Sequence, residues 1–198
     1  MSTIIKVAAV LAALTFSACS TTLVPIKYVP SRVITSGYSI STVATVHSSD
    51  DRGAGSNWLG AIRGGFGNPL KILRTEVPIS DVVTAAFLDA MRARSMLGVP
   101  DSASKALEIS ITKFDCSQLA RLEAHAHLKI TIVSLPQRVP VFSKSYLTDN
   151  AEFSWAGGIF ADVNVLADFA QATLNETIDK ALSDPFFLDA LSAAASPN

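Results

Sequence analysis

The chain has 198 residues, 49% of them hydrophobic and 17% charged, and its 16 basic and 17 acidic residues leave a formal net charge of −1. This composition excludes an intrinsically disordered chain, which needs low hydrophobicity and high net charge. Without a run of Lys and Arg, there is no electrostatic basis for nucleic-acid binding. Two cysteines are too few for a disulfide framework or a cysteine zinc site. The length fits a single domain.

The first eighteen residues are typical of a secretory signal peptide. Lys6 supplies a positive charge, and the apolar run 7–16 is too short for a membrane span, which needs about 20 residues. The following Ser17-Ala18-Cys19 resembles the lipobox of bacterial lipoproteins. That resemblance implies cleavage before Cys19 and lipidation of this residue, so the membrane would be bound through its lipid. Ordinary secretory cleavage after Ser20 is the alternative.

The resemblance also predicts the cellular location of the protein. Ser20 stands where an aspartate would imply retention in the inner membrane. We therefore expect attachment to the outer membrane, facing the periplasm. Residues 20–35 contain Pro25 and Pro30 without a sustained period, which predicts an extended tether between lipid and domain. The expected division is a signal peptide at 1–18, a lipidated N-terminus and tether at 19–35, one domain at 36–193, and a disordered tail at 194–198.

Periodicity predicts the elements of the first half of the domain. Alternation predicts a strand in which one face carries Tyr38, Ile40, Thr42, Ala44 and Val46. Two short strands, 58–62 and 70–74, flank a glycine-rich turn. A helix capped by Ser80 is expected to stop at Gly98 and to present an apolar stripe of Val83, Ala86, Phe87, Ala90 and Met91.

The second half continues with three strands and two helices. Strands are predicted at 107–111, 122–132 and 141–148, with a turn at 115–118 between the first two. The middle strand alternates apolar and polar residues, as in an antiparallel sheet covered on one side. A long helix is expected at 162–183, and Asp184-Pro185 predicts the start of a terminal helix. The fold class is α+β, a two-layer sandwich of a mostly antiparallel sheet with two long helices on one face.

This layout resembles the YajG-like family of small bacterial envelope lipoproteins. The features that carry the resemblance are the lipobox, the Asp51-Arg52 loop after the first strand, the helix ending near Gly98, the 107–133 hairpin, and the final helix closing at 181–185. The auxiliary lipoproteins of envelope lipid transporters are more distant in layout. The resemblance implies no established reaction; it implies an envelope protein that binds a partner.

The strongest chemical candidates are Glu123, His125 and His127, which share the polar face of one predicted strand. Two imidazoles and a carboxylate can bind zinc or copper if a neighbouring strand supplies a further ligand. His47, at the end of the first strand, is a candidate for that ligand. The alternative is that a half-exposed strand simply carries polar residues.

Motifs of catalysis and cofactor binding are missing from the sequence. It has neither a G-x-S-x-G elbow nor a phosphate-binding loop, since the glycines at 64–67 lack the required lysine and serine. The adjacent carboxylates of Asp50 and Asp51 are typical of turns, and Cys116 follows an aspartate, which does not favour a reactive thiolate. Aromatic residues near element ends could form a contact surface or close the core: Trp58, Phe66, Trp155, Phe160, Phe186 and Phe187.

The sequence therefore predicts a non-catalytic, lipid-anchored lipoprotein that uses no cofactor and binds another protein as an accessory component of an envelope complex. The alternatives are a periplasmic metal-binding protein or hydrolase that uses His125 and His127, and a carrier that holds a lipid between the helices and the sheet.

Overall fold

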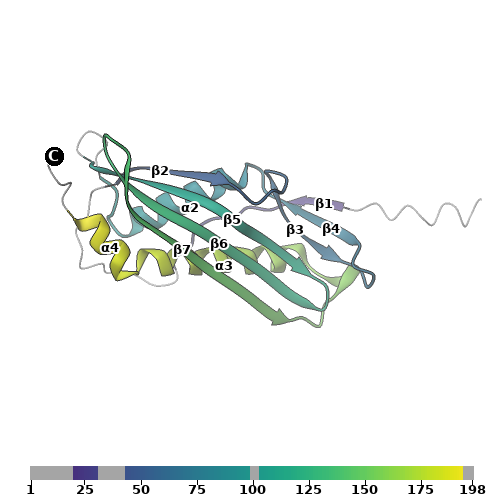
Figure 1. Ribbon diagram of the computed structural model, residues 1–198. Coiled ribbons are helices and arrows are strands. Elements are labelled where there is room, and N and C mark those ends of the chain that lie inside the picture. The colour runs from purple at the N-terminus through teal and green to yellow at the C-terminus, as the bar shows by residue number, and fades with distance from the viewer. Residues whose placement is uncertain (1–19, 31–42, 99–102, 194–198) are drawn as a thin grey trace, which may run out of the picture.

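In the computed structural model, which describes residues 20–30, 43–98 and 103–193, a seven-stranded sheet forms one layer and helices form the other. Helices α2 (Ile79–Ala93) and α3 (Val163–Leu182) lie behind the sheet in Figure 1, and the short helix α4 (Pro185–Ser192) lies near one end. The predicted two-layer α+β class is confirmed, with two long helices and a third short one.

The strands follow the order β1-β4-β3-β5-β6-β7, and β2 pairs with β5 beside this path. The two longest pairings, β5 with β6 and β6 with β7, are antiparallel, as is β3 with β4. Three pairings are parallel, namely β1–β4, β2–β5 and β3–β5, and the sequence did not reveal them. The strand bounds are β1 Ser20–Leu23, β2 Val43–Asp50, β3 Trp58–Arg63, β4 Pro69–Arg74, β5 Lys105–Gln118, β6 Arg121–Ser134 and β7 Val139–Phe153.

The loop after β2 stabilises the point at which β2 ends and β3 begins to pair with β5. Strands β2 and β3 share one edge of β5, β2 along its first half and β3 along its last three residues. Between them, the buried Arg52 donates hydrogen bonds to the carbonyl oxygens of Phe114 (2.7 Å) and Trp58 (2.9 Å) and to both carboxylate oxygens of Asp50 (2.7 Å each). This contact holds the pKa of Asp50 below its usual value. Arg52 thus supplies hydrogen bonds to backbone carbonyl groups in the gap between β2 and β3 along the edge of β5.

The helices follow the predicted apolar stripes. All five residues expected on the α2 stripe are buried. The expected Ser80 cap is wrong, because the helix begins at Ile79 with Pro78 in the cap position and Ser80 lies inside it. The helix ends at Ala93, well before the expected Gly98. Asp162 caps α3 by accepting a hydrogen bond from the Asn164 amide, and Asp184 caps α4 through the Phe186 amide. The expected Asp-Pro start of the terminal helix is confirmed.

The predicted turn at 115–118 is wrong, because β5 continues to Gln118. The alternation of buried and partly exposed residues persists to the end of the strand, where Phe114, Cys116 and the polar Gln118 are buried. Cys116 is a free thiol packed against β3, and a side chain at Gly60 would lie 2.0 Å from its carbonyl oxygen. Burial, reinforced by the neighbouring Asp115, raises the pKa of this thiol far above its usual value. The position is structural and the thiol unreactive.

The last sheet strand is also longer than the predicted 141–148. Strand β7 runs from Val139 to Phe153 and includes Pro140 near its start. A proline is tolerated there because β7 pairs only with β6 and forms an edge of the sheet.

The N-terminal segment corrects the tether prediction. Residues 20–23 form β1, which pairs in parallel with β4, and Val24, Ile26 and Tyr28 are buried in the core. The two-residue alternation survives Pro25, which occupies an exposed position. Residues 20–30 therefore belong to the domain. The rest of the expected tether, the signal peptide, Cys19 and the tail at 194–198 lie outside the described residues.

Candidate functional site

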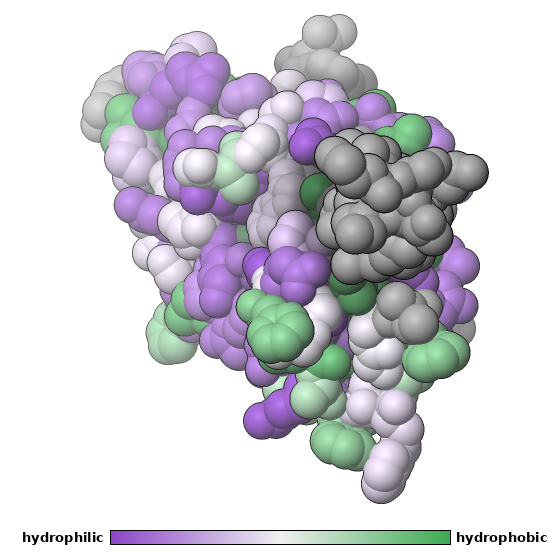
Figure 2. Space-filling model, turned by 90° about the vertical axis from the view of Figure 1, so that its right-hand side faces the viewer, coloured by the Kyte–Doolittle hydropathy of each residue, from purple (hydrophilic) through white to green (hydrophobic). Residues whose placement is uncertain are grey.

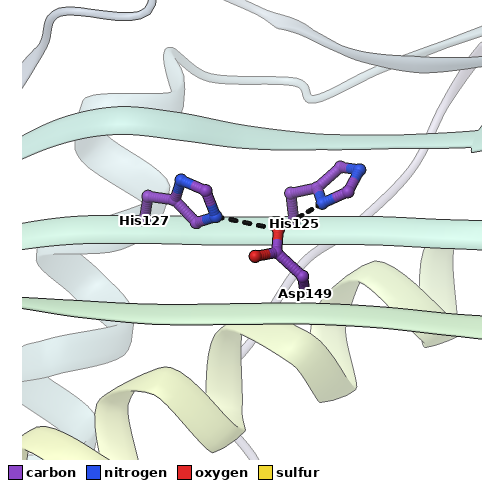
Figure 3. Close-up of side chains that lie close together, drawn as sticks. All are labelled: His125, His127 and Asp149. Carbon is purple, nitrogen blue, oxygen red and sulfur yellow. Dashed lines mark hydrogen bonds and ion pairs between the residues drawn. The ribbon is translucent and has the colours of Figure 1, made fainter.

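Two histidines and an aspartate meet on the face of the sheet that the helices leave open. His125 and His127 project from β6 and Asp149 from β7 (Figure 3). The Asp149 Oδ1 atom lies 2.5 Å from His125 Nδ1 and 2.8 Å from His127 Nε2. Because an ionised carboxylate only accepts hydrogen bonds, both ring nitrogens donate to it. One nitrogen from each ring and one carboxylate oxygen lie within 4.8 Å of one another.

Strand geometry explains this grouping. The two-residue period of β6 turns Ala124, Ala126 and Leu128 toward the helices, and their complete burial leaves His125 and His127 on the opposite face. The antiparallel register places Asp149 directly opposite His125. His127 reaches the same carboxylate along the diagonal, which is within range for long side chains.

The cluster is accessible and charged. The side chains of His125, His127 and Asp149 are 26%, 22% and 55% exposed. The hydrogen bonds from His125, followed by those from His127, hold the pKa of Asp149 below its usual value, so its carboxylate stays ionised at neutral pH. On the neighbouring β5, Asp115 lies opposite His125 and Lys113 opposite His127. The cluster therefore presents two imidazole nitrogens and a carboxylate oxygen that a metal cation could reach from solvent.

The other predicted ligands lie elsewhere. Glu123 shares the open face, but its cross-strand neighbours are Ser117 and Ala151, and it is not part of the cluster. His47 pairs with Glu108 on β5 and lines a separate hollow of about 510 Å³ on the open face. Sequence reasoning thus found both histidines and missed the carboxylate that binds them.

A second feature is the apolar end of the molecule, defined here by Phe66, Leu119, Phe153, Trp155 and Phe160, all of which are exposed. They lie on the β3–β4 turn, on the β5–β6 turn, and on the last residue of β7 and the segment after it, which meet at the right-hand end of Figure 1. Figure 2 faces this end and shows apolar groups standing among polar ones. The Phe153 and Trp155 rings pack edge to face with centroids 5.0 Å apart.

Hydrogen bonds fasten the loop of the apolar end to the sheet. Gln118 Nε2 donates to the carbonyl oxygen of Ala156, and Lys71 Nζ donates to that of Ala161 over 2.7 Å. In the parallel β1–β4 register, Ser20 lies beside Lys71. The residue that directly follows Cys19 is therefore positioned at the apolar end.

The aromatic residues singled out from the sequence divide between surface and core. Phe66, Trp155 and Phe160 are exposed at the apolar end, and Phe186 is exposed on α4. Phe187 is fully buried, and Trp58 is partly buried at the start of β3. Closure of the core is confirmed for Phe187, whereas Phe66, Trp155, Phe160 and Phe186 are exposed and their role as a contact surface stays a prediction.

Across residues 20–30, 43–98 and 103–193, no helix has the length and the apolar character needed to cross a membrane.

No protein-family model matches the chain, and neither does any curated protein. Among solved structures, a DUF330 protein from Xanthomonas campestris is similar over 87% of this chain and 96% of its own, with 14% identity and a TM-score of 0.59. A predicted lipoprotein from Caulobacter crescentus CB15 covers 75% of this chain and 89% of its own, with 13% identity and a TM-score of 0.43. Lipoprotein GNA1162 from Neisseria meningitidis covers 69% and 96%, with 11% identity and a TM-score of 0.28. The first similarity shows that the chain shares the fold of the DUF330 protein.

Proposed function

We propose that the chain is a bacterial lipoprotein, anchored through lipid on Cys19 to the periplasmic face of the outer membrane, where it acts as a non-catalytic accessory component of an envelope complex. The signal-like residues 1–18 and the lipobox-like Ser17-Ala18-Cys19 support the anchor. The observation that carries the proposal is the position of Ser20, which is already the first residue of β1.

Because β1 begins directly after Cys19, the expected tether does not separate a lipid on Cys19 from the domain. Consecutive Cα atoms are only about 3.8 Å apart, so a lipidated Cys19 brings the start of β1 to the membrane surface. The apolar end then meets the bilayer. Exposed aromatic side chains such as Trp155 suit this location, because their rings are stable at the boundary between lipid and water. The lipid and the apolar end would fix the orientation of the domain.

With the apolar end on lipid, the open face of the sheet is left for a protein partner. Leu147 is exposed there, between Tyr146 and Thr148, which point to the helices and are buried. The core side chains of both layers fill the space between sheet and helices, which favours partner binding over lipid carriage. The histidines bond to a carboxylate rather than to a hydroxyl or thiol, so they do not activate a side-chain nucleophile.

Two experiments test the proposal. Replacement of Cys19 by Ser should leave the precursor uncut or release the protein from membranes, and normal processing with unchanged membrane partition would refute the anchor. A photo-cross-linking residue at position 147 should capture an envelope protein in intact cells. The same residue at position 66, on the apolar end, should instead cross-link to lipid. Cross-links to lipid alone from both positions would refute the partner-binding role.

A further inference from the structure

We propose that His125, His127 and Asp149 form a binding site for a divalent first-row transition cation such as Zn²⁺. The site is the juxtaposition of two imidazoles from alternate residues of β6 with the carboxylate that lies opposite on β7 (Figure 3). Metal binding does not depend on the anchor or on a protein partner, so the inference stands apart from the proposed function.

The distances are close to those of a metal centre. Zinc binds imidazole nitrogen at about 2.0–2.1 Å and carboxylate oxygen at about 2.0–2.2 Å, so tetrahedral ligand atoms lie roughly 3.3 Å apart. Asp149 Oδ1 is now 2.5 Å from His125 Nδ1 and 2.8 Å from His127 Nε2. A cation entering between them would spread each pair by less than about 1 Å. The three ligand atoms already lie within 4.8 Å of one another, and all three side chains reach solvent, which leaves them room to rotate.

The backbone beneath the site is rigid. Strand β6 is paired along its whole length, with β5 on one side and β7 on the other. Its inward residues Ala124, Ala126 and Leu128 have no exposed surface. The Cα positions of the ligands are therefore fixed by the sheet before the cation arrives, which lowers the cost of assembling the site.

The surrounding charges favour a cation. Three acidic side chains lie on the open face here, namely Asp149, Asp115 opposite His125 and Glu123 two residues before His125. Two basic ones lie on the same face, namely Lys113 opposite His127 and Lys129 two residues after His127, so the acidic groups are in excess. Neutral imidazole binds metal through a bare nitrogen. Each ring nitrogen that now donates to Asp149 must therefore pass its hydrogen to the other ring nitrogen, or release it to water if the ring is doubly protonated.

Three protein ligands leave the solvent side of the cation open. Structural zinc sites are closed by four protein ligands, whereas sites with three keep a position for water or another molecule. The open face of the sheet supplies room for that fourth ligand. We therefore expect reversible binding of one cation per chain, weaker than that of a closed structural site.

The test is titration of the untagged full-length protein with Zn²⁺ by calorimetry, and with Co²⁺ by visible absorbance. We expect one cation per chain and a dissociation constant near or below about 10 µM, or roughly −7 kcal/mol. His125→Ala, His127→Ala and Asp149→Asn should each weaken binding at least about tenfold, the effect of losing roughly 1.4 kcal/mol. The matched control is His47→Ala, which removes a histidine from another part of the same face and should leave the affinity unchanged.

Three results would overturn the site. The first is the absence of saturable Zn²⁺ binding up to about 1 mM, a concentration that corresponds to only about −4 kcal/mol. The second is Zn²⁺ binding that survives loss of both His125 and His127. The third is an equal weakening of binding by His47→Ala. Asp149→Asn binding as tightly as the unmodified chain would likewise overturn the three-ligand site. Thermal unfolding of each variant establishes that it is folded, which is expected because the changed side chains are on the surface.

Discussion

Asp179 and Asp149 each accept two side-chain hydrogen bonds at one carboxylate oxygen, but one cluster is largely buried and the other is exposed. Asp179 Oδ1 accepts hydrogen bonds from Tyr28 Oη and Arg94 Nη2, each over 2.6 Å. Asp149 Oδ1 accepts from His125 and His127 over 2.5 and 2.8 Å. The Arg94 side chain is only 1% exposed, whereas the two histidines are more than a fifth exposed.

The difference in burial assigns different roles to the two clusters. A buried guanidinium cannot lose its partner without a large desolvation cost, so the Asp179 cluster holds the N-terminal segment, through Tyr28, onto α2 and α3. An exposed pair can exchange its hydrogen bonds with water at little cost, so the Asp149 cluster is free to bind a ligand. The first cluster joins residues 20–30 to the helices, and the second is accessible from solvent.

The largest effect should come from Arg94→Met, which removes the ion pair between the buried Arg94 guanidinium and Asp179. We expect a loss of about 3–5 kcal/mol in the free energy of unfolding, measured by urea denaturation. The control is Arg92→Ala, because the Arg92–Asp89 pair is on the surface and should contribute at most about 1 kcal/mol. Equal effects of the two changes would show that burial does not distinguish them.

Removal of one hydroxyl should have an intermediate effect. Tyr28→Phe keeps the buried ring but deletes the hydrogen bonds of Tyr28 Oη to Asp179 and Arg94. Such a deletion inside a protein costs about 1–3 kcal/mol. Urea denaturation measures it, and protease digestion should show faster cleavage within residues 20–30. A stability equal to that of the unmodified chain would mean that the Asp179 cluster does not hold this segment.

The smallest effect should come from Asp149→Asn, because the cluster is exposed. We expect less than about 1 kcal/mol at neutral pH. The pKa of Asp149 is lowered on folding, so its contribution is present above the ordinary value of 3.8 and is lost as the pH falls through the lower folded value. The stability of the variant should therefore fall less between pH 5 and 2. Identical acid profiles for the two proteins would contradict this.

Periodicity revealed the helices, the two faces of β6 and both histidines, because a buried face repeats locally along the chain. It did not reveal that residues 20–30 belong to the domain. Two prolines in this segment were interpreted as the mark of a tether, although Val24, Ile26 and Tyr28 alternate with polar or exposed residues. The parallel pairings of β1 and β3 depend on contacts between distant segments, which no local pattern encodes.

The Asp149 ligand was missed for a related reason, because it depends on the register between β6 and β7. Pro136 and Pro140 lie on either side of Gln137, and a hairpin turn centred there pairs His125 with Asp149 or a close neighbour. These two prolines were therefore a usable signal for the register. The role of Arg52 could not be predicted either, because the two carbonyl groups that it binds lie on β3 and β5, which are far apart in sequence.

The central claim is that no spacer separates the lipid from the domain, so the apolar end lies on the bilayer. The chain has two tryptophans, Trp155 at that end and Trp58 at the end of β3 away from the turn. Trp58→Phe therefore makes Trp155 the sole tryptophan, and Trp155→Phe leaves only Trp58. Both variants, lipidated on Cys19, would be reconstituted into vesicles whose phospholipid chains carry bromine, which quenches tryptophan fluorescence on contact.

The emission of Trp155 should fall strongly in brominated relative to ordinary vesicles, and that of Trp58 should stay unchanged. If Trp155 keeps its full emission while the protein remains bound to the vesicles, the apolar end does not touch lipid and the claim is contradicted.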